Sequence, residues 1–598
     1  MRSIKYLYRI AFVCLLVSAI QGCNDDFMDR FPLDQINDEN FWRTAQDLEL
    51  YNNSLYPIYI NGFGYGWADG SVQPFGYNIS SIAYGDIITD NAVPNSYSRV
   101  AANQYNGHIT GSSGSGGWSW GNLRRINFFL ENYQRGNVPD DVRNVYAGEV
   151  YFFKAMEYFD KVKTFGDVPW ITEAFETNSE GLYAPRDSRE IVMDSILLVL
   201  DKAIAYLPQK GVEKPGRLHK DAARFLKARV GLYEGTFRKY HSDLGLDGAK
   251  YLQACVDAAE QLMENGYSIY STGDPDKDYN SLFAQFQYRN NPEVILYKEY
   301  SADLNLGSAF SRYYAQNQRH QHGATRDLVE EYLCADGLPI SQSPLYQGKE
   351  TLSDELTNRD LRLRQTVCDY GEYALASHVQ GSNNSPLPNI PGLSGNKCPT
   401  GYRIAKWFID SVSDWDLVTR GQQATPMFRY AELLLNYAEA KYELGQMDQG
   451  VLDNTINKIR ARVDMPPLSI GNIPDDPSLE QKYAQYIGYV PAPVLREIRR
   501  ERRVELAFEN TRWDDLVRWK AGKFLEIPVE GFKFEQERYP TVVVDRDVFL
   551  SEEGYLRPYH QVLPEGRQWE DRQYLFPIPI EDLVLNPNLV QNPGWESN

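Results

Sequence analysis

Apolar residues recur every three or four positions over much of the chain, a spacing that places them on one face of an α-helix. The first such run follows Thr44, a typical helix-capping residue, with Asp47 three positions on as in a capping box. The pattern predicts helices over residues 45–56, 118–132, 140–165, 188–207, 221–237, 249–265, 427–444, 451–463 and 494–520. The chain is therefore predicted to be mainly α-helical.

Several of these helices follow one another as pairs. Residues 221–237 and 249–265 are predicted to pack antiparallel, and successive pairs rich in Ala and Tyr resemble degenerate tetratricopeptide repeats. We expect a short right-handed superhelix that acts as a scaffold. Residues 267–425 are mixed and loop-rich, with a strand candidate at Glu293–Tyr297 and a long surface loop at 379–401.

The two late helical stretches carry charge in a regular pattern. In residues 427–444 a polar stripe lies opposite an apolar one; its members are Arg429, Glu432, Asn436, Glu439 and Glu443. In residues 494–520 the spacing allows Glu497 to pair with Arg500, and Arg502 with Glu505. We expect a buried ion network that locks two helices together.

Residues 61–117 lack a helical period, and glycine alternates with aromatic residues at their start. Glycine supplies backbone freedom while the rings supply contact area, so this stretch is predicted to be a loop with a role in recognition. About half of its rings are expected to hold the loop in place instead.

The amino-terminal residues predict export. Three basic residues precede an apolar run from Ile10 to Ile20, which is well short of the ~20 residues that span a bilayer. The run ends in Ile20-Gln21-Gly22-Cys23, which resembles a bacterial lipobox. Residues 1–22 are thus predicted to be a removed signal and Cys23 a lipid anchor. The acidic residues after Cys23 resemble the tether of surface-exposed Bacteroidetes lipoproteins.

Charge and composition narrow the choice of ligand. Loss of residues 1–22 changes the formal charge from −20 to −23, which argues against a nucleic-acid partner. The 42 Tyr and 11 Trp exceed what a core usually needs. Sugars bind by laying their C–H faces on such rings, whose polar edges remain in water.

Signatures of catalysis or of a cofactor are missing from the sequence, so no cofactor, metal or catalytic residue is predicted. Cys255, Cys334, Cys368 and Cys398 are scattered without zinc spacing, and their pairing stays open. His320 and His322 are expected to be surface residues. Four residues mimic half a calcium loop but lack its glycine and bidentate glutamate; they are Asp274, Asp276, Asp278 and Asn280. A glycosidase carboxylate pair has no fixed spacing and stays open.

Several motifs in this order resemble the SusD/RagB family of Bacteroidetes outer-membrane lipoproteins over nearly the whole mature chain. They are the lipobox, Phe41-Trp42, Phe165-Gly-Asp-Val-Pro169, Asp336-Gly-Leu-Pro-Ile340, Arg429-Tyr-Ala-Glu432 with the Leu433–Ala440 run, the arginine-rich stretch from Arg499 to Trp519, Leu575-Phe-Pro-Ile-Pro579 and Asn586-Pro-Asn-Leu-Val-Gln-Asn-Pro593. The arginine-rich stretch and the Asn-Pro-Asn tail are the most specific of them.

The resemblance implies one SusD-like domain over residues 23–598, with four tetratricopeptide-like helix pairs as scaffold and an irregular ligand-binding remainder. The scaffold is expected at about 40–60, 118–266 and 426–520, and the loop-rich parts at 61–117, 267–425 and 521–598. The resemblance also implies capture of an oligosaccharide and its delivery, without any reaction, to a SusC-like TonB-dependent transporter on which the chain sits as a hinged lid.

The family has no fixed binding motif, so the expected ligand-binding residues are chosen from loop aromatics and nearby polar groups. They are Tyr65, Trp67, Asp69, Tyr77, Asn95, Tyr97, Tyr300, Tyr313, Tyr314 and Trp415. Trp118 and Trp120 resemble structural tryptophans of the family and are left out. A peptide-binding RagB-like protein, a surface glycoside hydrolase and a purely structural surface protein are the alternatives.

Overall fold

Helices dominate the part of the chain that the computed structural model describes, residues 41–64, 82–94, 112–315, 322–369, 390–393 and 398–596. The α-helices are α2 (Ala45–Asn53), α3 (Tyr56–Tyr59), α4 (Gly121–Asn132), α5 (Asp140–Phe165), α6 (Arg189–Tyr206), α7 (Lys220–Tyr240), α8 (Ala249–Met263), α9 (Asp278–Phe283), α10 (Phe310–Ala315), α11 (Arg326–Glu331), α12 (Leu352–Leu356), α13 (Leu361–Thr366), α14 (Val412–Asp416), α15 (Tyr430–Glu443), α16 (Gln449–Asn454), α17 (Ile456–Ala461), α18 (Pro477–Tyr486), α19 (Pro493–Glu505), α20 (Arg512–Arg518) and α21 (Ile580–Leu585). The predicted mainly α fold is confirmed.

Observed helix ends agree best with the predicted ones where the capping residue is a sequence neighbour of the helix. The Thr44 side chain accepts the Asp47 N–H at 3.3 Å, and the Asp47 carboxylate accepts the Thr44 N–H at 2.8 Å, which completes the predicted capping box of α2. Ser188 caps α6 in the same position, and α5 has the predicted bounds. These caps satisfy N–H groups that a helix leaves unpaired.

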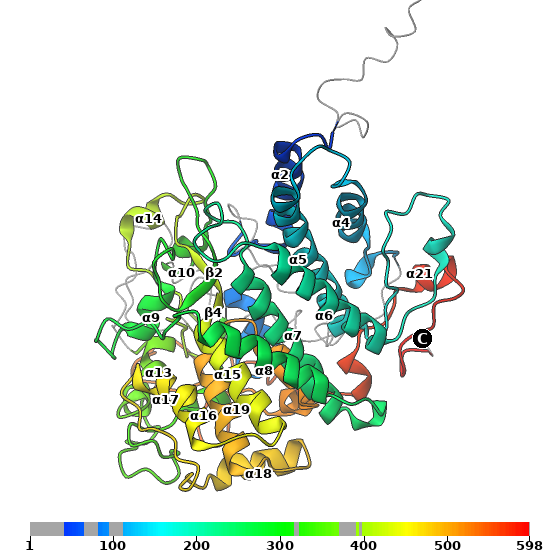
Figure 1. Cartoon of the computed structure of the whole chain (residues 1–598). Coiled ribbons are helices and arrows are strands. Elements are labelled where there is room, and N and C mark those ends of the chain that lie inside the picture. The colour runs from blue at the N-terminus through cyan, green and yellow to red at the C-terminus, as the bar shows by residue number, and fades with distance from the viewer. Residues whose placement is uncertain are drawn as a thin grey trace, which may run out of the picture.

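The scaffold is a succession of packed helices. α4 packs on α5, α5 on α6, α6 on α7 and α7 on α8, and α15 then covers both α7 and α8. Figure 1 shows this layer running from α2 and α5 down to α15, α16 and α19. Gly231 and Gly235 on α7 allow a close approach to α8, because a Cβ on Gly231 would lie 2.5 Å from the Tyr251 carbonyl oxygen. The predicted pairing of these two helices is confirmed.

The irregular remainder is built around two short antiparallel ladders. β2 (Val294–Lys298), predicted as a strand, pairs with β4 (Thr425–Arg429), and β1 (Ala92–Pro94) pairs with β3 (His322–Ala324). The helix predicted from residue 427 therefore begins only at Tyr430. The start is shifted because the preceding residues join β2, and the Tyr430 N–H donates to the Glu293 carbonyl oxygen.

Two predicted helices are each broken in two. Thr455, with φ −127° and ψ −92°, separates α16 from α17, and its hydroxyl donates to the Val451 carbonyl oxygen at 2.5 Å. The stretch predicted as one helix over 494–520 is α19 and α20, separated by a turn in which Phe508 and Asn510 have φ near 60°.

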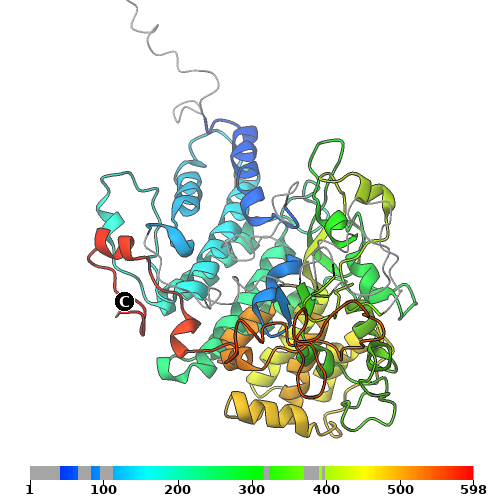
Figure 2. The same cartoon turned by 180° about the vertical axis from the view of Figure 1, so that it is seen from behind.

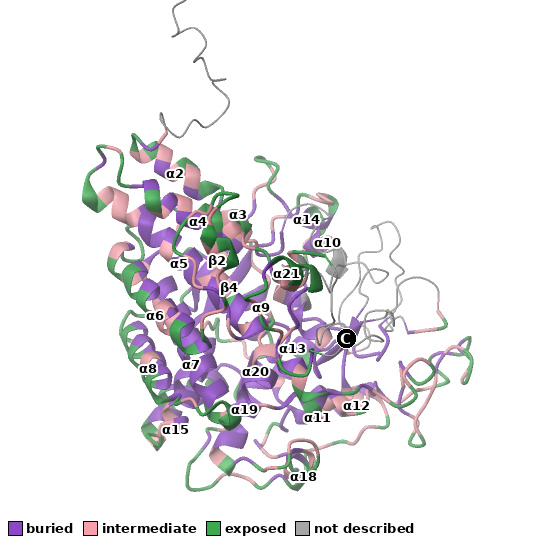
Figure 3. Cartoon of the chain, turned by 90° about the vertical axis from the view of Figure 1, so that its right-hand side faces the viewer, coloured by how far each residue is buried: buried purple, intermediate pink, exposed green. Residues whose placement is uncertain are grey.

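The carboxyl-terminal segment returns to the amino-terminal helices. Arg186 Nη1 donates to Asn592 Oδ1 at 2.7 Å, and the Phe576 N–H donates to the Thr164 carbonyl oxygen at 2.7 Å. The view from behind shows the red terminal segment with α21 beside the cyan helices (Figure 2). The outer helices α6 and α8 are buried on one face and exposed on the other, whereas α7 is buried over most of its length (Figure 3). Among the described helices, none is both long and apolar enough to cross a bilayer.

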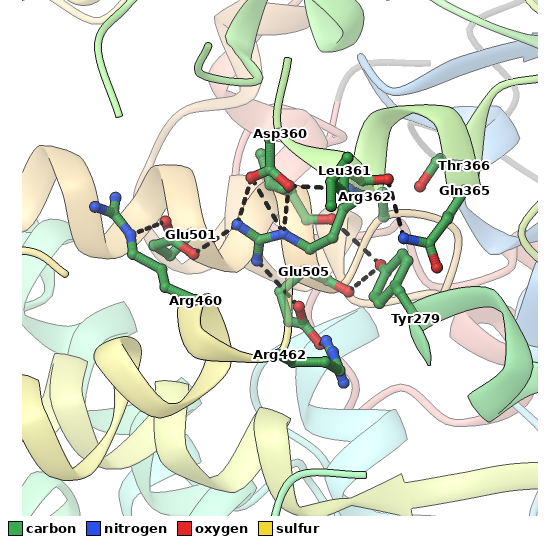
Figure 4. Close-up of polar contacts among 12 residues, drawn as sticks. Tyr279, Asp360, Leu361, Arg362, Gln365, Thr366, Arg460, Arg462, Glu501 and Glu505 are labelled. Atoms are coloured by element: carbon green, nitrogen blue, oxygen red, sulfur yellow. Dashed lines mark hydrogen bonds and ion pairs between the residues drawn. The ribbon is translucent and has the colours of Figure 1, made fainter. Parts of the chain in front are cut away.

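The expected buried ion network exists, and Glu505 is at its centre (Figure 4). Its fully buried carboxylate accepts from Arg429 at 2.7 Å, from Arg362 at 3.0 Å and from Arg462. Burial alone would raise the pKa of Glu505, but these three guanidinium groups hold it well below its ordinary value. The network joins α13, β4 and the end of α17 to α19.

The partners of individual charges differ from the sequence prediction. Arg500 pairs with Glu497 at 3.2 Å, as expected. The predicted Arg502–Glu505 pair is wrong, because Arg502 binds both oxygens of Asp515 at 2.8 Å. The polar stripe of α15 is buried rather than solvated; Glu439, for example, receives Arg518 on both oxygens at 2.6 Å.

Replacing Glu505 by Gln should lower the free energy of unfolding by about 3–5 kcal/mol, because three buried guanidinium groups lose their shared anion. Urea denaturation followed by circular dichroism measures the loss. The control is Glu176→Gln, which removes the exposed partner of Arg124 at 2.7 Å and should change the free energy by less than about 1 kcal/mol. Equal losses in the two variants would contradict a central role for Glu505.

Candidate ligand-binding region

The predicted ligand-binding residues fall into three groups. Six of them lie outside the described residues, as does Cys23; the six are Tyr65, Trp67, Asp69, Tyr77, Asn95 and Tyr97. Tyr313 and Tyr314 lie on α10, but their side chains are not described. Only Tyr300 and Trp415 can be placed in full.

Tyr300 and Trp415 are both buried, with exposed fractions of 8% and 2%. The Tyr300 hydroxyl donates to the Asn61 carbonyl oxygen at 3.3 Å. The Trp415 indole N–H donates to the Ile409 carbonyl oxygen at 3.0 Å, and its ring lies 5.7 Å from that of Phe408. Both rings therefore pack inside the protein, and their role in stacking on a ligand stays a prediction.

Residues 61–64, which lead into the predicted recognition loop, are held by the second loop-rich part. Lys298 Nζ donates to the Asn61 carbonyl oxygen at 2.7 Å, and the Phe63 N–H donates to Thr425 Oγ1 at 3.2 Å. Ser308 Oγ donates to the Phe63 carbonyl oxygen at 3.3 Å. The first recognition loop thus starts beside β2 and β4.

An aromatic cluster lies under this stem. The Phe63 ring stacks on Phe310, the first residue of α10, at 3.7 Å between centroids with an interplanar angle of 6°. Trp407 meets Phe63 edge-on at 5.5 Å, and all three side chains are buried. The stem of residues 61–64 and the start of α10 therefore share one hydrophobic cluster.

α14, which carries Trp415, is tied to α10 by a buried carboxylate. Asp414 Oδ2 accepts from Ser311 Oγ at 2.5 Å, and Oδ1 accepts the Gln422 N–H at 2.6 Å. Burial raises the pKa of Asp414 above its ordinary value, against the effect of these hydrogen bonds. Tyr300, α10 and Trp415 thus belong to one packed region beside the stem.

In the sequence, residues 82–94 lie between two groups of predicted ligand residues. The first group is Tyr65, Trp67, Asp69 and Tyr77, and the second is Asn95 and Tyr97. It contains the 3-10 helix η2 (Ile82–Ile88) and β1, where Ala92 is paired with Ala324 and Pro94 with His322. His322 is buried, contrary to the expected surface position, because it is part of this ladder; burial lowers its pKa to about 3. His320 lies outside the described residues.

Two buried carboxylates in this segment, Asp86 and Asp90, were missed by the sequence analysis. The available signal was two acids four positions apart, one inside the mostly apolar run Ile82–Thr89 and one directly after it. Asp86 Oδ2 accepts the Phe508 N–H at 2.7 Å and Asn91 Nδ2 at 2.9 Å. Burial raises the pKa of Asp86 to about 6 in spite of these bonds.

Metal chemistry has no support in the described part of the chain, where no group of three or more His, Cys, Asp or Glu residues could hold an ion. Asp278, from the half calcium loop, accepts instead from Ser271 Oγ and Thr272 Oγ1 at 2.6 Å. Cys255, Cys334 and Cys398 are buried thiols that form no disulfide within the described residues, and Cys368 is buried as well.

Comparison with known proteins agrees with this architecture. The model of the SusD family matches residues 292–595, just over half of the chain. SusD-like protein P38 of Formosa agariphila is 23% identical over 549 residues, which cover 89% of this chain and 95% of that protein. A crystal structure of a SusD-like carbohydrate binding protein from Bacteroides fragilis has a TM-score of 0.71 at 22% identity, and the match covers 92% of this chain and 100% of that one.

A further solved structure is described as a laminarin binding SusD-like protein; its TM-score is 0.53 at 19% identity, with 92% of this chain and 98% of that chain covered. The fold is thus that of SusD-like proteins, a helical scaffold with an irregular remainder. The chain belongs to the SusD family.

The Asp86→Asn variant should change how stability depends on pH. The folded state holds the Asp86 proton more tightly than the unfolded chain, so the stability that this proton contributes is present below pH 3.8 and is lost as the pH rises through 6. The free energy of unfolding of the wild type, relative to Asp86→Asn, should therefore fall by about 2 kcal/mol between pH 4 and pH 7. Urea denaturation at each pH measures it, and parallel curves for the two proteins would contradict the raised pKa.

Proposed function

We propose that this chain is a surface glycan-binding lipoprotein that captures oligosaccharides and delivers them to a SusC-like TonB-dependent transporter, acting as its lid. Membership of the SusD family supports the class of function. The fold shared with a SusD-like carbohydrate binding protein and a laminarin binding SusD-like protein supports a glycan as ligand. No reaction is part of the proposal, and residues 23–598 act as one domain.

The observation that carries the proposal is the junction of two loop-rich parts far apart in sequence. Residues 61–64 lead to Tyr65, Trp67, Asp69 and Tyr77, and they contact Lys298, Tyr300 and Ser308. The described residues that precede the first group of predicted rings therefore contact the second loop-rich part. A ligand longer than one sugar needs such a group of rings rather than a single one.

The proposed binding residues are those predicted from the sequence. Tyr65, Trp67, Tyr77 and Tyr97 act as stacking surfaces, and Asp69 and Asn95 bond hydroxyl groups; Tyr300, Tyr313, Tyr314 and Trp415 come from the second loop-rich part. Stacking contributes about 1 kcal/mol per ring, so binding is weak and needs several rings.

Affinity electrophoresis and calorimetry of residues 24–598 against laminarin, xylan, pectin, yeast mannan and mucin glycans test capture. We expect one class to bind without any release of product, and Trp67→Ala to weaken binding at least fivefold because a stacking surface is lost. The control is Tyr183→Ala, which removes a 54% exposed tyrosine of the 3-10 helix η6 (Glu180–Tyr183) and should leave the affinity unchanged.

Two results would count against glycan capture, and a third would count against the proposed ring surface alone. Absence of binding across the panel, together with binding of oligopeptides, would favour the peptide-binding alternative. Release of shortened sugars, abolished by changing two acids, would make the protein a hydrolase. An unchanged affinity in Trp67→Ala would remove the proposed ring surface while leaving the class of ligand in place.

Lipid anchoring and the transporter can be tested together in the source bacterium. The tagged wild type should fractionate with the outer membrane, resist release by salt and co-purify with a TonB-dependent barrel that mass spectrometry identifies. Cys23→Ser should become soluble because it lacks the thiol that carries the lipid. Membrane retention of Cys23→Ser would contradict the anchor, and absence of the barrel from the wild-type membrane complex would contradict the partner.

A further inference from the structure

Residues 82–94, here called the anchor segment, are almost completely buried although the chain on either side leads to predicted ligand residues. Tyr77 lies five residues before the segment, and Asn95 follows it directly. Buried positions in the segment include Ala83, Asp86, Thr89, Asp90 and Asn91, each with an exposed fraction of 1% or less. The anchor segment is thus a buried stretch of chain that lies, in sequence, between two groups of predicted ligand residues.

The strongest contact of the anchor segment is a buried ion cluster at Asp90. Arg512 of α20 binds both carboxylate oxygens, at 2.8 Å through Nε and 2.7 Å through Nη2. Arg503 of α19 lies 3.1 Å from Oδ2. Burial opposes the charge of Asp90, but the two guanidinium groups hold its pKa below the ordinary value. This bidentate geometry fixes both the distance and the orientation of the pair.

Further hydrogen bonds, to backbone carbonyl groups and to the Asn91 side chain, also hold the anchor segment. Arg503 Nε donates to Asn91 Oδ1 at 2.8 Å. Thr325, which caps α11, donates through Oγ1 to the Asp90 carbonyl oxygen at 2.6 Å and through N–H to the Asn91 carbonyl oxygen at 2.9 Å. Arg567 Nη1 donates to the Thr89 carbonyl oxygen at 2.9 Å.

The turn between α19 and α20 is shaped to the anchor segment. Asn510 packs so closely on Gly85 that a Cβ there would lie 1.8 Å from Asn510 Oδ1. Phe508, with φ 61°, donates its N–H to Asp86 at 2.7 Å. Left-handed backbone is unfavourable for phenylalanine, so this geometry depends on the contacts that hold it.

We propose that Arg512 and Arg503 are positioning residues for ligand binding: through Asp90 they hold the anchor segment against the scaffold, and they thereby fix the two ends from which the chain leads to predicted ligand residues. The inference rests on the proposed function. Neither arginine touches the ligand, because both are buried. Their effect on affinity comes from pre-organisation, which spares binding the entropy of ordering the loops.

Arg512→Gln tests this inference against a matched variant. The matched pair is Arg189 and Glu234. It is buried, it is bidentate at 3.0 Å from Nε to Oε1 and 2.7 Å from Nη2 to Oε2, and it joins α6 to α7 far from the anchor segment in sequence. Both Arg→Gln variants should lose thermal stability. Only Arg512→Gln should weaken binding of the tightest polysaccharide of the panel, by tenfold or more, at a temperature where both variants are fully folded. Arg512→Lys, which keeps the charge but not the fork, should show an intermediate affinity.

Hydrogen exchange of the full mature chain supplies a readout that needs no ligand. Amides of residues 82–94 should exchange at least tenfold faster in Arg512→Gln and remain protected in Arg189→Gln. If Arg512→Gln fails to fold, Arg567→Ala replaces it, with a smaller increase expected at the same amides.

The outcomes separate the two proposals. A twofold or smaller change in affinity for Arg512→Gln, or an equal loss in Arg189→Gln, overturns the positioning role even if the wild type binds glycan. Unchanged exchange at residues 82–94 overturns it as well. If the wild type binds no polysaccharide of the panel, the proposed function fails, while faster exchange confined to residues 82–94 still supports the anchor.

Discussion

The carboxylate of Glu505 accepts three guanidinium groups inside the protein, and these contacts join α13, β4 and the end of α17 to α19. Removing any of these charges from water costs several kcal/mol, and only the partners recover that cost. Arg429 is the clearest partner, since it contacts Glu293 at 2.8 Å, Glu505 at 2.7 Å and Glu509 at 2.6 Å. Moving any one of α13, β4, α17 or α19 away would leave a buried charge without its partner, so the network opposes other arrangements of these elements.

α19 has charged side chains on every side and is nevertheless buried. Successive residues of a helix point about 100° apart, so neighbouring arginines reach different elements. Arg500 binds Asp476 at the start of α18, Arg502 binds Asp515 of α20, and Arg503 reaches Asp90 of the anchor segment. A helix of this composition usually lies in solvent. Here it is the centre to which scaffold and loop-rich part are both attached.

The sequence was sufficient to predict elements that depend on neighbouring residues. It was insufficient to predict elements whose conformation depends on residues far away in the chain. The Thr44 capping box and the bounds of α5 could be predicted because the responsible residues are neighbours. The break after α19 could not, because Phe508 and Asn510 take their conformation from Asp86 and Gly85, more than 400 positions earlier. The same holds for β4, whose residues fit a helical period but pair with β2.

The candidate site, too, could be predicted only in part from the sequence. Aromatic residues among glycines were enough to predict a recognition role for these segments, but not to predict what holds them. Asp90 and Arg512 are 422 positions apart, and neither belongs to a motif for binding. Affinity depends on ring contacts minus the cost of ordering the chain that carries them. Because stacking gains only about 1 kcal/mol per ring, a loop ordered upon binding would lose most of that gain. In the proposed role of the anchor segment, burial and fixed charges between the predicted ligand residues would reduce this cost, and the scaffold would contribute to binding without touching the ligand.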